Sequence, residues 1–270
     1  AREMFTFYGV AWTDAAACFL NGPAPPEIYT MVDSQVESAR FGRRVRRYEL
    51  IGDDAAPLLE SLRTEPPDLA IVRIPTSRGE LITQLCELGG QFVLGDCRVI
   101  YTRDNQAAGR PGGRREAAFR LRPASTGDAM LLDSLVERIF AGYHTHYISN
   151  PRLAPFPLTD GYKEWTRSHV GSGEKRCLIA EMEDEPCAFT TLHVTAAAGE
   201  VVLNGVLPAY RGKGVYRELL RATIDTFIDA GARTTVIATQ IDNRAVQRVW
   251  VTEGFSLARS EYTIHINFGG

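Results

Sequence analysis

A glycine-rich, basic turn between an apolar strand and an amphipathic helix is the part of this sequence best suited to chemistry. The turn reads Arg211-Gly212-Lys213-Gly214-Val215-Tyr216, between a predicted strand at 201–206 and a predicted helix at 215–230. Glycine lets the backbone approach a ligand closely and adopt unusual dihedral angles. The first turn of a helix offers unpaired N–H groups and the positive end of its dipole. The sequence therefore predicts a phosphate-binding turn.

The spacing of the glycines decides which phosphate motif fits. A P-loop needs four residues between its glycines, and a Rossmann turn needs a third glycine at position 217, which is arginine. The pattern that fits is Arg-x-x-Gly-x-(Gly/Ala), with Arg211, Gly214 and, in place of the usual small residue, Tyr216. It resembles the pyrophosphate loop of the Gcn5-related N-acetyltransferases (GNAT). Taken alone, a basic glycine turn is more often structural.

A second block strengthens the resemblance. After a predicted strand at 234–239, residues 243–255 are similar to the GNAT pattern Asn-x-x-Ala-x-x-x-Tyr-x-x-x-Gly-Phe. Asn243, Gly254 and Phe255 are in register, and Trp250 replaces the common tyrosine. Asn243 is also a plausible helix N-cap and Gly254 a plausible residue after a helix C-terminus. The order of the two blocks, with a strand between them, indicates the family.

Periodicity and turn signals predict two domains. The Gly- and Pro-rich stretch 106–115 is expected to be a linker between an N-terminal α/β domain (1–105) and a GNAT acyltransferase domain (116–270). The N-terminal domain, accessory or partially GNAT-like, has a predicted β-α-β run at 69–74, 76–88 and 92–101. The other predicted elements are strands at 118–121, 177–181 and 187–194, helices at 128–140, 159–170 and 243–253, and a final strand pair within 255–267. The fold class is α/β (α+β), with a mixed, mostly antiparallel sheet flanked by helices.

One subgroup of the family is similar over more of the chain. The opening Phe7-Tyr8-Gly9-Val10, the β-α-β piece, the linker and the acyltransferase domain resemble the dTDP-fucosamine acetyltransferases, which acetylate the amino group of a nucleotide-linked sugar. The resemblance is close in the C-terminal domain and loose over residues 1–105. Fold carries over on this basis, but substrate does not.

The resemblance implies acyl transfer from acetyl-CoA, or another acyl-CoA, to a small-molecule amine. The implied donor site consists of Val206, Leu207, Arg211, Gly212, Lys213, Gly214, Val215, Tyr216 and Asn243. Backbone N–H groups near Val206 and Leu207 would polarise the thioester carbonyl. Because Trp250 cannot act as an acid, Tyr262 in the final strand is expected to protonate the leaving thiolate. The alternative for Tyr262 is simple packing on the sheet.

Other candidate residues are less specific. Glu200, at the start of the central strand, is a possible general base, although a hairpin glutamate is more often merely exposed. Tyr143, His144, His146 and Tyr147 lie in the loop that usually contacts the acceptor, and either line its pocket or face solvent. No metal is expected, because no set of residues has metal-ligand spacing.

Composition limits the kinds of binding partner and the cellular compartment to be expected. A net charge of −3 gives no general attraction to nucleic acid or a membrane surface. Five scattered cysteines and the absence of a long apolar run suggest a cytoplasmic protein. Five arginines within 40–47 are either a solvated face or a docking surface for an acidic partner such as a carrier protein. The final strand could exchange between subunits of a homodimer.

Two other functions stay open at this level. The acyl donor could be bound to a carrier protein or to tRNA, in which case the loop need not fit the adenosine end of coenzyme A. The domain could also be a binding module that has lost turnover. Thioester cleavage in the presence of amines distinguishes an enzyme from such a module.

Overall fold

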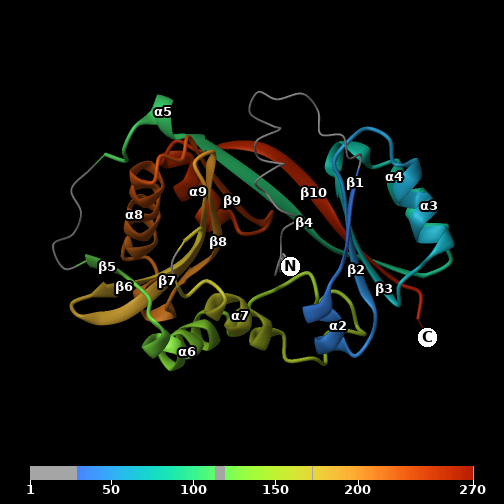
Figure 1. Ribbon diagram of the computed structural model, residues 1–270, viewed down its shortest axis with the longest axis horizontal. Coiled ribbons are helices and arrows are strands. Elements are labelled where there is room, and N and C mark those ends of the chain that lie inside the picture. The colour runs from blue at the N-terminus through green and yellow to red at the C-terminus, as the bar shows by residue number, and fades with distance from the viewer. Residues whose placement is uncertain (1–28, 113–118, 172, 270) are drawn as a thin grey trace. The chain divides into compact units, whose positions relative to one another are not determined.

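The computed structural model describes residues 29–112, 119–171 and 173–269. It divides into two compact units, each built from discontinuous stretches of the chain (Figure 1). Unit 1 comprises residues 1–99, 144–156 and 259–270, and unit 2 comprises residues 100–143 and 157–258. Two long strands explain this division: β4 (Gln91–Asp104) begins in unit 1 and ends in unit 2, and β10 (Ser256–Asn267) does the reverse. The opening Phe7–Val10 lies outside the described residues.

Unit 1 is a sheet with strand order β1-β2-β3-β10-β4. Strand β1 (Tyr29–Asp33) pairs antiparallel with β2 (Val45–Leu50), β2 pairs parallel with β3 (Leu69–Pro75), and β10 pairs antiparallel with β3. Helix α2 (Gln35–Phe41) connects β1 to β2, and α3 (Ala56–Thr64) is the crossover between the parallel strands. A short 3₁₀ helix (Thr76–Arg78) and α4 (Leu81–Cys86) precede β4. The N-terminal part is therefore α/β, as its periodicity predicts.

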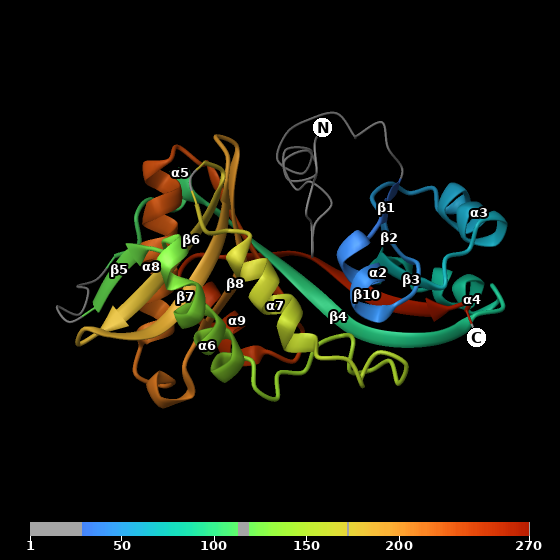
Figure 2. The same ribbon diagram turned by 60° about the horizontal axis from the view of Figure 1, so that its bottom comes forward.

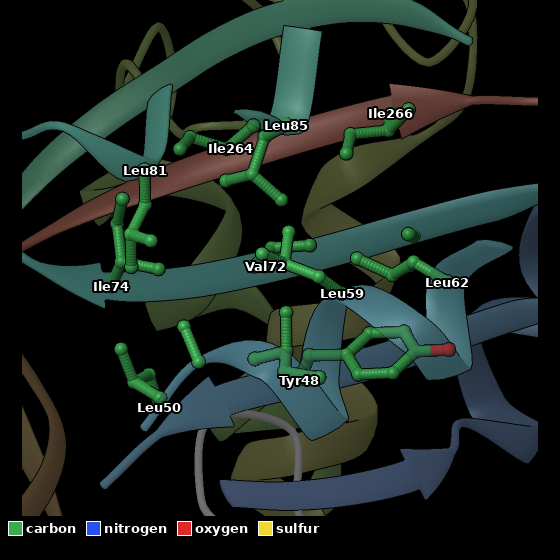
Figure 3. Close-up of a cluster of buried hydrophobic side chains, with 13 residues drawn as sticks. Tyr48, Leu50, Leu59, Leu62, Val72, Ile74, Leu81, Leu85, Ile264 and Ile266 are labelled. Atoms are coloured by element: carbon green, nitrogen blue, oxygen red, sulfur yellow. The ribbon is translucent and has the colours of Figure 1, made fainter. Parts of the chain in front are cut away.

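One face of the unit 1 sheet is apolar. Side chains point alternately to the two faces along each strand, and those that point to this face are hydrophobic. On β10, Ile264 and Ile266 face the same side as Val72 of β3, and Leu59 of α3 and Leu85 of α4 cover them (Figure 3). Each fully buried side chain of this kind contributes roughly 1.5–3 kcal/mol. The buried residues of the cluster are Tyr48, Leu50, Ala55, Leu58, Leu59, Leu62, Ala70, Val72, Ile74, Leu81, Leu85, Ile264 and Ile266.

The opposite face of that sheet is polar but almost closed to solvent. Its strand residues alternate with those of the apolar face, so β10 places Glu261 and His265 there. Glu261 accepts hydrogen bonds from Arg98 of β4 at 2.8 and 3.1 Å. Glu37 of α2, completely buried, binds Arg47 of β2 in a two-pronged ion pair. Buried charges are tolerated here because each carboxylate has guanidinium donors.

The strands continue in unit 2 in the order β4-β9-β8-β7-β6-β5, as part of the same ten-stranded sheet. The antiparallel strands are β5 (Phe119–Pro123), β6 (Lys175–Met182), β7 (Glu185–Val194) and β8 (Ala198–Val206), and β9 (Thr234–Gln240) is parallel to β8. The longer helices of unit 2 are α6 (Ala129–Ile139), α7 (Leu158–Arg167), α8 (Val215–Asp229) and α9 (Arg244–Thr252). These elements match the predicted C-terminal order.

Helices cover both faces of this sheet (Figure 2). A Cβ added to Gly199 of β8 would lie 2.2 Å from the ring of Phe227 on α8, whereas one added to Gly205 would lie 2.3 Å from Ile139 on α6. A register shift in β8 near Val201 reverses the alternation between these two glycines, so they face opposite helices. Glycine at each position allows a helix to approach the sheet closely.

Three local expectations need correction. Residues 256–267 form one strand, not a pair, because no turn interrupts the extended backbone. Helix α7 spans Leu158–Arg167 and so ends three residues before the end of the predicted helix 159–170. The start of the predicted linker is helical, with α5 at Asn105–Ala108. The segment 144–156 is grouped with the N-terminal strands in unit 1, and the predicted division into domains at 106–115 stays a prediction.

Candidate functional site

The predicted phosphate turn lies between β8 and α8, as its sequence indicates. A 3₁₀ helix (Pro208–Tyr210) leads into it, and Gly214 is the N-cap of α8. Gly212 and Gly214 have φ of 76° and 82°, a region that favours glycine. No heavy atom lies within 4 Å of a Cβ placed on either residue. The turn therefore leaves room for a ligand beside the unpaired N–H groups of the helix N-terminus, which suits the pyrophosphate of a nucleotide thioester.

Arg211 holds the turn to its surroundings. Its guanidinium donates to the backbone carbonyls of Val206 at 3.3 Å and Ile139 at 3.1 Å. Ile139 is the last residue of α6, so the side chain satisfies a carbonyl that has no partner within that helix. The Leu207 N–H donates to the Cys187 carbonyl at 2.8 Å and is thus engaged in the sheet. Lys213 is exposed and lies 5.4 Å from the ring of Tyr210.

Strands β8 and β9 diverge next to this turn. Their parallel pairing runs from Ala198 and Thr234 to Val201 and Ile237 and stops there, although both strands continue. The register shift in β8 puts Asn204 on the same side as Val201, toward α8. Sequence reasoning did not identify Asn204. Its only signal is that it is an amide within the apolar stretch 201–206.

Tyr216, the second residue of α8, makes the most specific contact of the site. Its hydroxyl accepts a 2.8 Å hydrogen bond from the indole Nε1 of Trp250 on α9, and the side chain of Asn204 also hydrogen-bonds to it. Burial raises the pKa of Tyr216 above its usual value, while these two hydrogen bonds oppose that shift. The tyrosine in the small-residue position of the turn thus aims its hydroxyl at the residue that replaces the family's tyrosine.

Residues after β9 complete this region. The hydroxyl of Tyr143 donates a short hydrogen bond to Oε1 of Gln240, the last residue of β9. Asn243 is the N-cap of α9 by position, but its side chain makes no capping bond and donates to Thr239 Oγ1 at 3.0 Å. The side-chain amide of Gln247 donates to the Ile241 carbonyl at 2.9 Å. The loop that follows β9 is therefore fixed by amide side chains.

Helix α9 is fixed against α8 by charge. Glu253, at the C-terminal end of α9, binds Arg221 of α8 at 2.9 Å and Arg217 at 3.3 Å. Trp250 is 1% exposed, and its ring packs edge-on against Tyr101, 5.3 Å between centroids. Because the ion pairs hold α9 against α8 and Tyr101 holds the Trp250 ring, the indole N–H points in a defined direction, toward the start of α8.

Glu200 lies where β8 and β9 still pair, opposite His193 of β7 and Val236 of β9. It alternates with Gly199, which faces Phe227 of α8. The side chain of Glu200 therefore faces the side of the sheet away from α8 and is half-buried. This is a position from which a carboxylate could receive a proton from an amine that approaches on that face. Its role as a base stays a prediction.

The four predicted acceptor residues fall into both units. Tyr143 is in unit 2, whereas His144, His146 and Tyr147 are in unit 1. His144 is exposed. His146 is buried, with its Nδ1 2.8 Å from Nε2 of His265, and burial lowers its pKa well below the usual value. Tyr147 is buried and bonds to Glu37 and Arg47.

Tyr262, the predicted proton donor, is also in unit 1. It pairs with Ile74 of β3, and its ring packs against the apolar cluster beneath α3 and α4. The phosphate turn belongs to unit 2. The resemblance remains the sole support for a catalytic role of Tyr262.

The basic stretch 40–47 does not present a free positive surface. Arg46 pairs with Asp33 at 2.7 Å and with Glu65 at 3.4 Å, Arg44 pairs with Glu65, and Arg47 pairs with Glu37. These carboxylate partners within unit 1 compensate much of the charge that a docking surface for an acidic partner would need. The segment instead connects α2, β2 and the start of β3.

Two features are absent from the described residues. In the ranges 29–112, 119–171 and 173–269, no three side chains of His, Cys, Asp or Glu are grouped so as to hold a metal ion. Over the same part of the chain, no helix has the length and apolar character needed to cross a membrane.

Comparison with known proteins points to one family. Residues 138–255 match the family described as "Acetyltransferase (GNAT) family", which covers the site from the end of α6 to Phe255. The spore coat polysaccharide biosynthesis protein SpsD of Bacillus subtilis is 25% identical over 150 residues, 55% of this chain and 50% of that protein. The chain spans about half the length of the curated relatives it matches.

Solved structures agree on the fold. A GCN5-related N-acetyltransferase from Kribbella flavida superposes with a TM-score of 0.60 at 12% identity, covering 96% of this chain and 94% of that one. A GCN5-related N-acetyltransferase from Sphaerobacter thermophilus gives a TM-score of 0.60 at 14% identity, covering 88% and 75%. At these identities, the likeness concerns the fold alone.

Proposed function

The chain carries an acetyltransferase domain of the GNAT family at residues 138–255, and we propose that it moves an acyl group from a coenzyme A thioester to the amine of a small molecule. The observation that carries this proposal is the turn 211–216, which combines two glycines at positive φ with a helix N-terminus. Such a turn binds the pyrophosphate through backbone N–H groups. The thioester would then lie where β8 and β9 diverge.

Acyl transfer from a thioester to an amine requires a neutral amine, a polarised carbonyl and a proton for the leaving thiolate. Glu200 is the proposed base, on the face of the sheet away from α8, and Tyr143, which bonds to Gln240 at the end of β9, is a proposed acceptor contact. Asn243 and its bond to Thr239 would position the start of α9 beside the pantetheine arm. Amino sugars linked to a nucleotide are the first acceptors to try, because a relative named for polysaccharide biosynthesis is 25% identical over half its length.

Binding and turnover test the proposal separately. Native mass spectrometry with acetyl-CoA should show one adduct per chain, and Gly214→Asp should abolish it because a carboxylate at the turn repels phosphate. Gly231→Asp is the matched control: Gly231 follows the other end of α8 with the same φ of 82° and open space around its Cβ position. Free thiol released in the presence of an amine panel then reports transfer.

Four outcomes are distinguishable. Binding with amine-dependent thiol release supports the enzyme. Binding without release for any amine, together with a pantetheine-linked carrier donor that does react, would assign the activity to a carrier-bound donor. Loss of binding in both aspartate variants would mean that strain, and not the ligand contact, explains the first result. No binding by the wild-type chain would contradict the proposal.

A further inference from the structure

The hydroxyl of Tyr216 lies beside the part of β8 that has separated from β9, the region to which the proposed function assigns the thioester. It contacts Asn204, on the part of β8 beyond its pairing with β9, and Trp250 of α9. Tyr143, which binds Gln240 at the end of β9, is close enough to influence the same hydroxyl electrostatically. Groups from β8, from α9 and from the loop after α6 therefore surround the phenol that α8 supplies.

The hydrogen-bond directions leave the phenol proton available. An indole N–H can only donate, so Tyr216 is the acceptor in its 2.8 Å contact with Trp250. The phenol oxygen thus receives a hydrogen bond while its own O–H remains a donor. The hydroxyl of Tyr143 differs, because it donates to Gln240. Of these two tyrosines, Tyr216 is the one whose contacts orient it as a proton donor.

We propose that Tyr216 is the catalytic acid that protonates the leaving thiolate, in place of Tyr262. This inference rests on the proposed acyl transfer. The amine nitrogen forms a bond to the thioester carbonyl carbon, and the carbon–sulfur bond breaks. The sulfur takes the Tyr216 proton, and the ammonium formed at nitrogen loses a proton to the base or water. Tyr216 regains its proton from solvent, so the products are an amide and a free thiol.

Trp250 and Asn204 would act as positioning residues. While the proton moves to sulfur, negative charge develops on the phenol oxygen, and a donor already aimed at that oxygen stabilises it without reorganisation. Burial, which raises the pKa of Tyr216, keeps the phenol protonated until the thiolate forms.

The surrounding packing keeps this geometry constant. The ring of Trp250 is fixed by Tyr101, and the Arg221–Glu253 ion pair fixes α8 against α9. The ring of Tyr262 packs against the apolar cluster of unit 1. Trp250 of α9 occupies the position of the family's tyrosine, and the phenol of Tyr216 lies next to it. The chain thus keeps a phenol in this place but supplies it from α8.

Steady-state kinetics with acetyl-CoA, on four forms of the full chain, test the inference. Tyr216→Phe should lower kcat by about 10²-fold or more, the usual value of general acid catalysis. Its affinity for acetyl-CoA, measured by calorimetry, should not fall with it. Tyr262→Phe should keep the wild-type kcat. Tyr210→Phe is the matched control, because it lies in the same turn and keeps the ring beside Lys213.

A second readout separates chemistry from packing. The acetyl ester of an acidic aryl thiol leaves without needing a proton, so the defect of Tyr216→Phe should shrink with that donor. A merely structural defect would affect both donors equally. Trp250→Phe, which keeps the phenol but removes its hydrogen bond, should show a smaller loss of kcat with the same dependence on thiol acidity, and it serves if Tyr216→Phe does not fold.

Each negative result would contradict a different hypothesis. If the wild-type chain neither binds acetyl-CoA nor releases thiol, the proposed function fails and the role of Tyr216 falls with it. If the wild-type chain is active and Tyr216→Phe keeps its kcat, the role of Tyr216 alone is overturned. A loss confined to Tyr262→Phe would assign the acid to that residue.

Discussion

The indole Nε1 of Trp250 lies 2.8 Å from the hydroxyl of Tyr216, to which it donates a hydrogen bond. The two residues belong to the two sequence blocks that resemble GNAT motifs, and each departs from its motif. Tyr216 is large where a small residue is usual, and Trp250 is an indole where a phenol is common. The structure shows that the two departures compensate each other.

Removing either partner of this contact should cost stability. Trp250→Phe and Tyr216→Phe should each lower the free energy of unfolding by about 1–3 kcal/mol, because each leaves a buried polar atom without its partner or shrinks a packed ring. The double variant should lose less than the sum of the two. Urea unfolding of all four forms gives the coupling energy, and strictly additive losses would show that the hydrogen bond contributes nothing.

Close packing at Gly199 predicts an unusually damaging alanine. The added Cβ would lie 2.2 Å from the ring of Phe227, which is fully buried. Gly199→Ala should therefore destabilise unit 2 by about 1–3 kcal/mol or more through overpacking. Adding Phe227→Leu, which by itself should also destabilise, ought to recover part of the loss. If the second change only adds to the first, the contact with Phe227 is not the cause.

The ion pair between Arg98 and Glu261 should matter far more than an exposed one. Burial alone would raise the pKa of Glu261, but Arg98, Arg259 and Arg73 outweigh burial and lower it. Glu261→Gln should cost about 3–5 kcal/mol of stability, since it leaves buried guanidinium charge uncompensated. The control is Glu65→Gln, which breaks an ion pair of an exposed carboxylate and should cost less than about 1 kcal/mol. Equal losses in thermal or urea unfolding would contradict this.

Buried histidine makes the fold sensitive to acid. Burial lowers the pKa of His265 to about 4 from an ordinary value near 6.5, with Arg47 and Arg73 acting in the same direction and Glu37 against it. Between these two pKa values the unfolded chain binds a proton that the folded chain does not. Stability is therefore complete above pH 6.5 and falls toward pH 4, by about 1.4 kcal/mol per pH unit for this residue.

Urea unfolding at several pH values measures this slope. His265→Gln should reduce the slope of the free energy of unfolding against pH by about 1.4 kcal/mol per pH unit, which corresponds to one proton. This holds even if the variant is also less stable at pH 7. His144→Gln removes an exposed imidazole and is the control. An unchanged slope in His265→Gln would show that the histidine is not the group that titrates.

Local sequence was sufficient for most elements of unit 2. The glycine turn, the strand before it and the helix after it follow from periodicity and from residues that tolerate positive φ, as at Gly214 and Gly231. The order of elements matched a known motif order, so the family could be recognised. These features depend on neighbours a few residues apart, which is why the sequence alone was enough to predict them.

Tertiary structure decided what the site residues contact. The register shift in β8 turns Asn204 toward α8, and only packing between α8 and α9 brings Tyr216 to Trp250. The division into units is another example, because β10 begins in unit 2 and pairs with β3 in unit 1, where Tyr262 packs among apolar side chains. Contacts between residues far apart in the chain depend on strand register and helix packing, and no local pattern of residues specifies those.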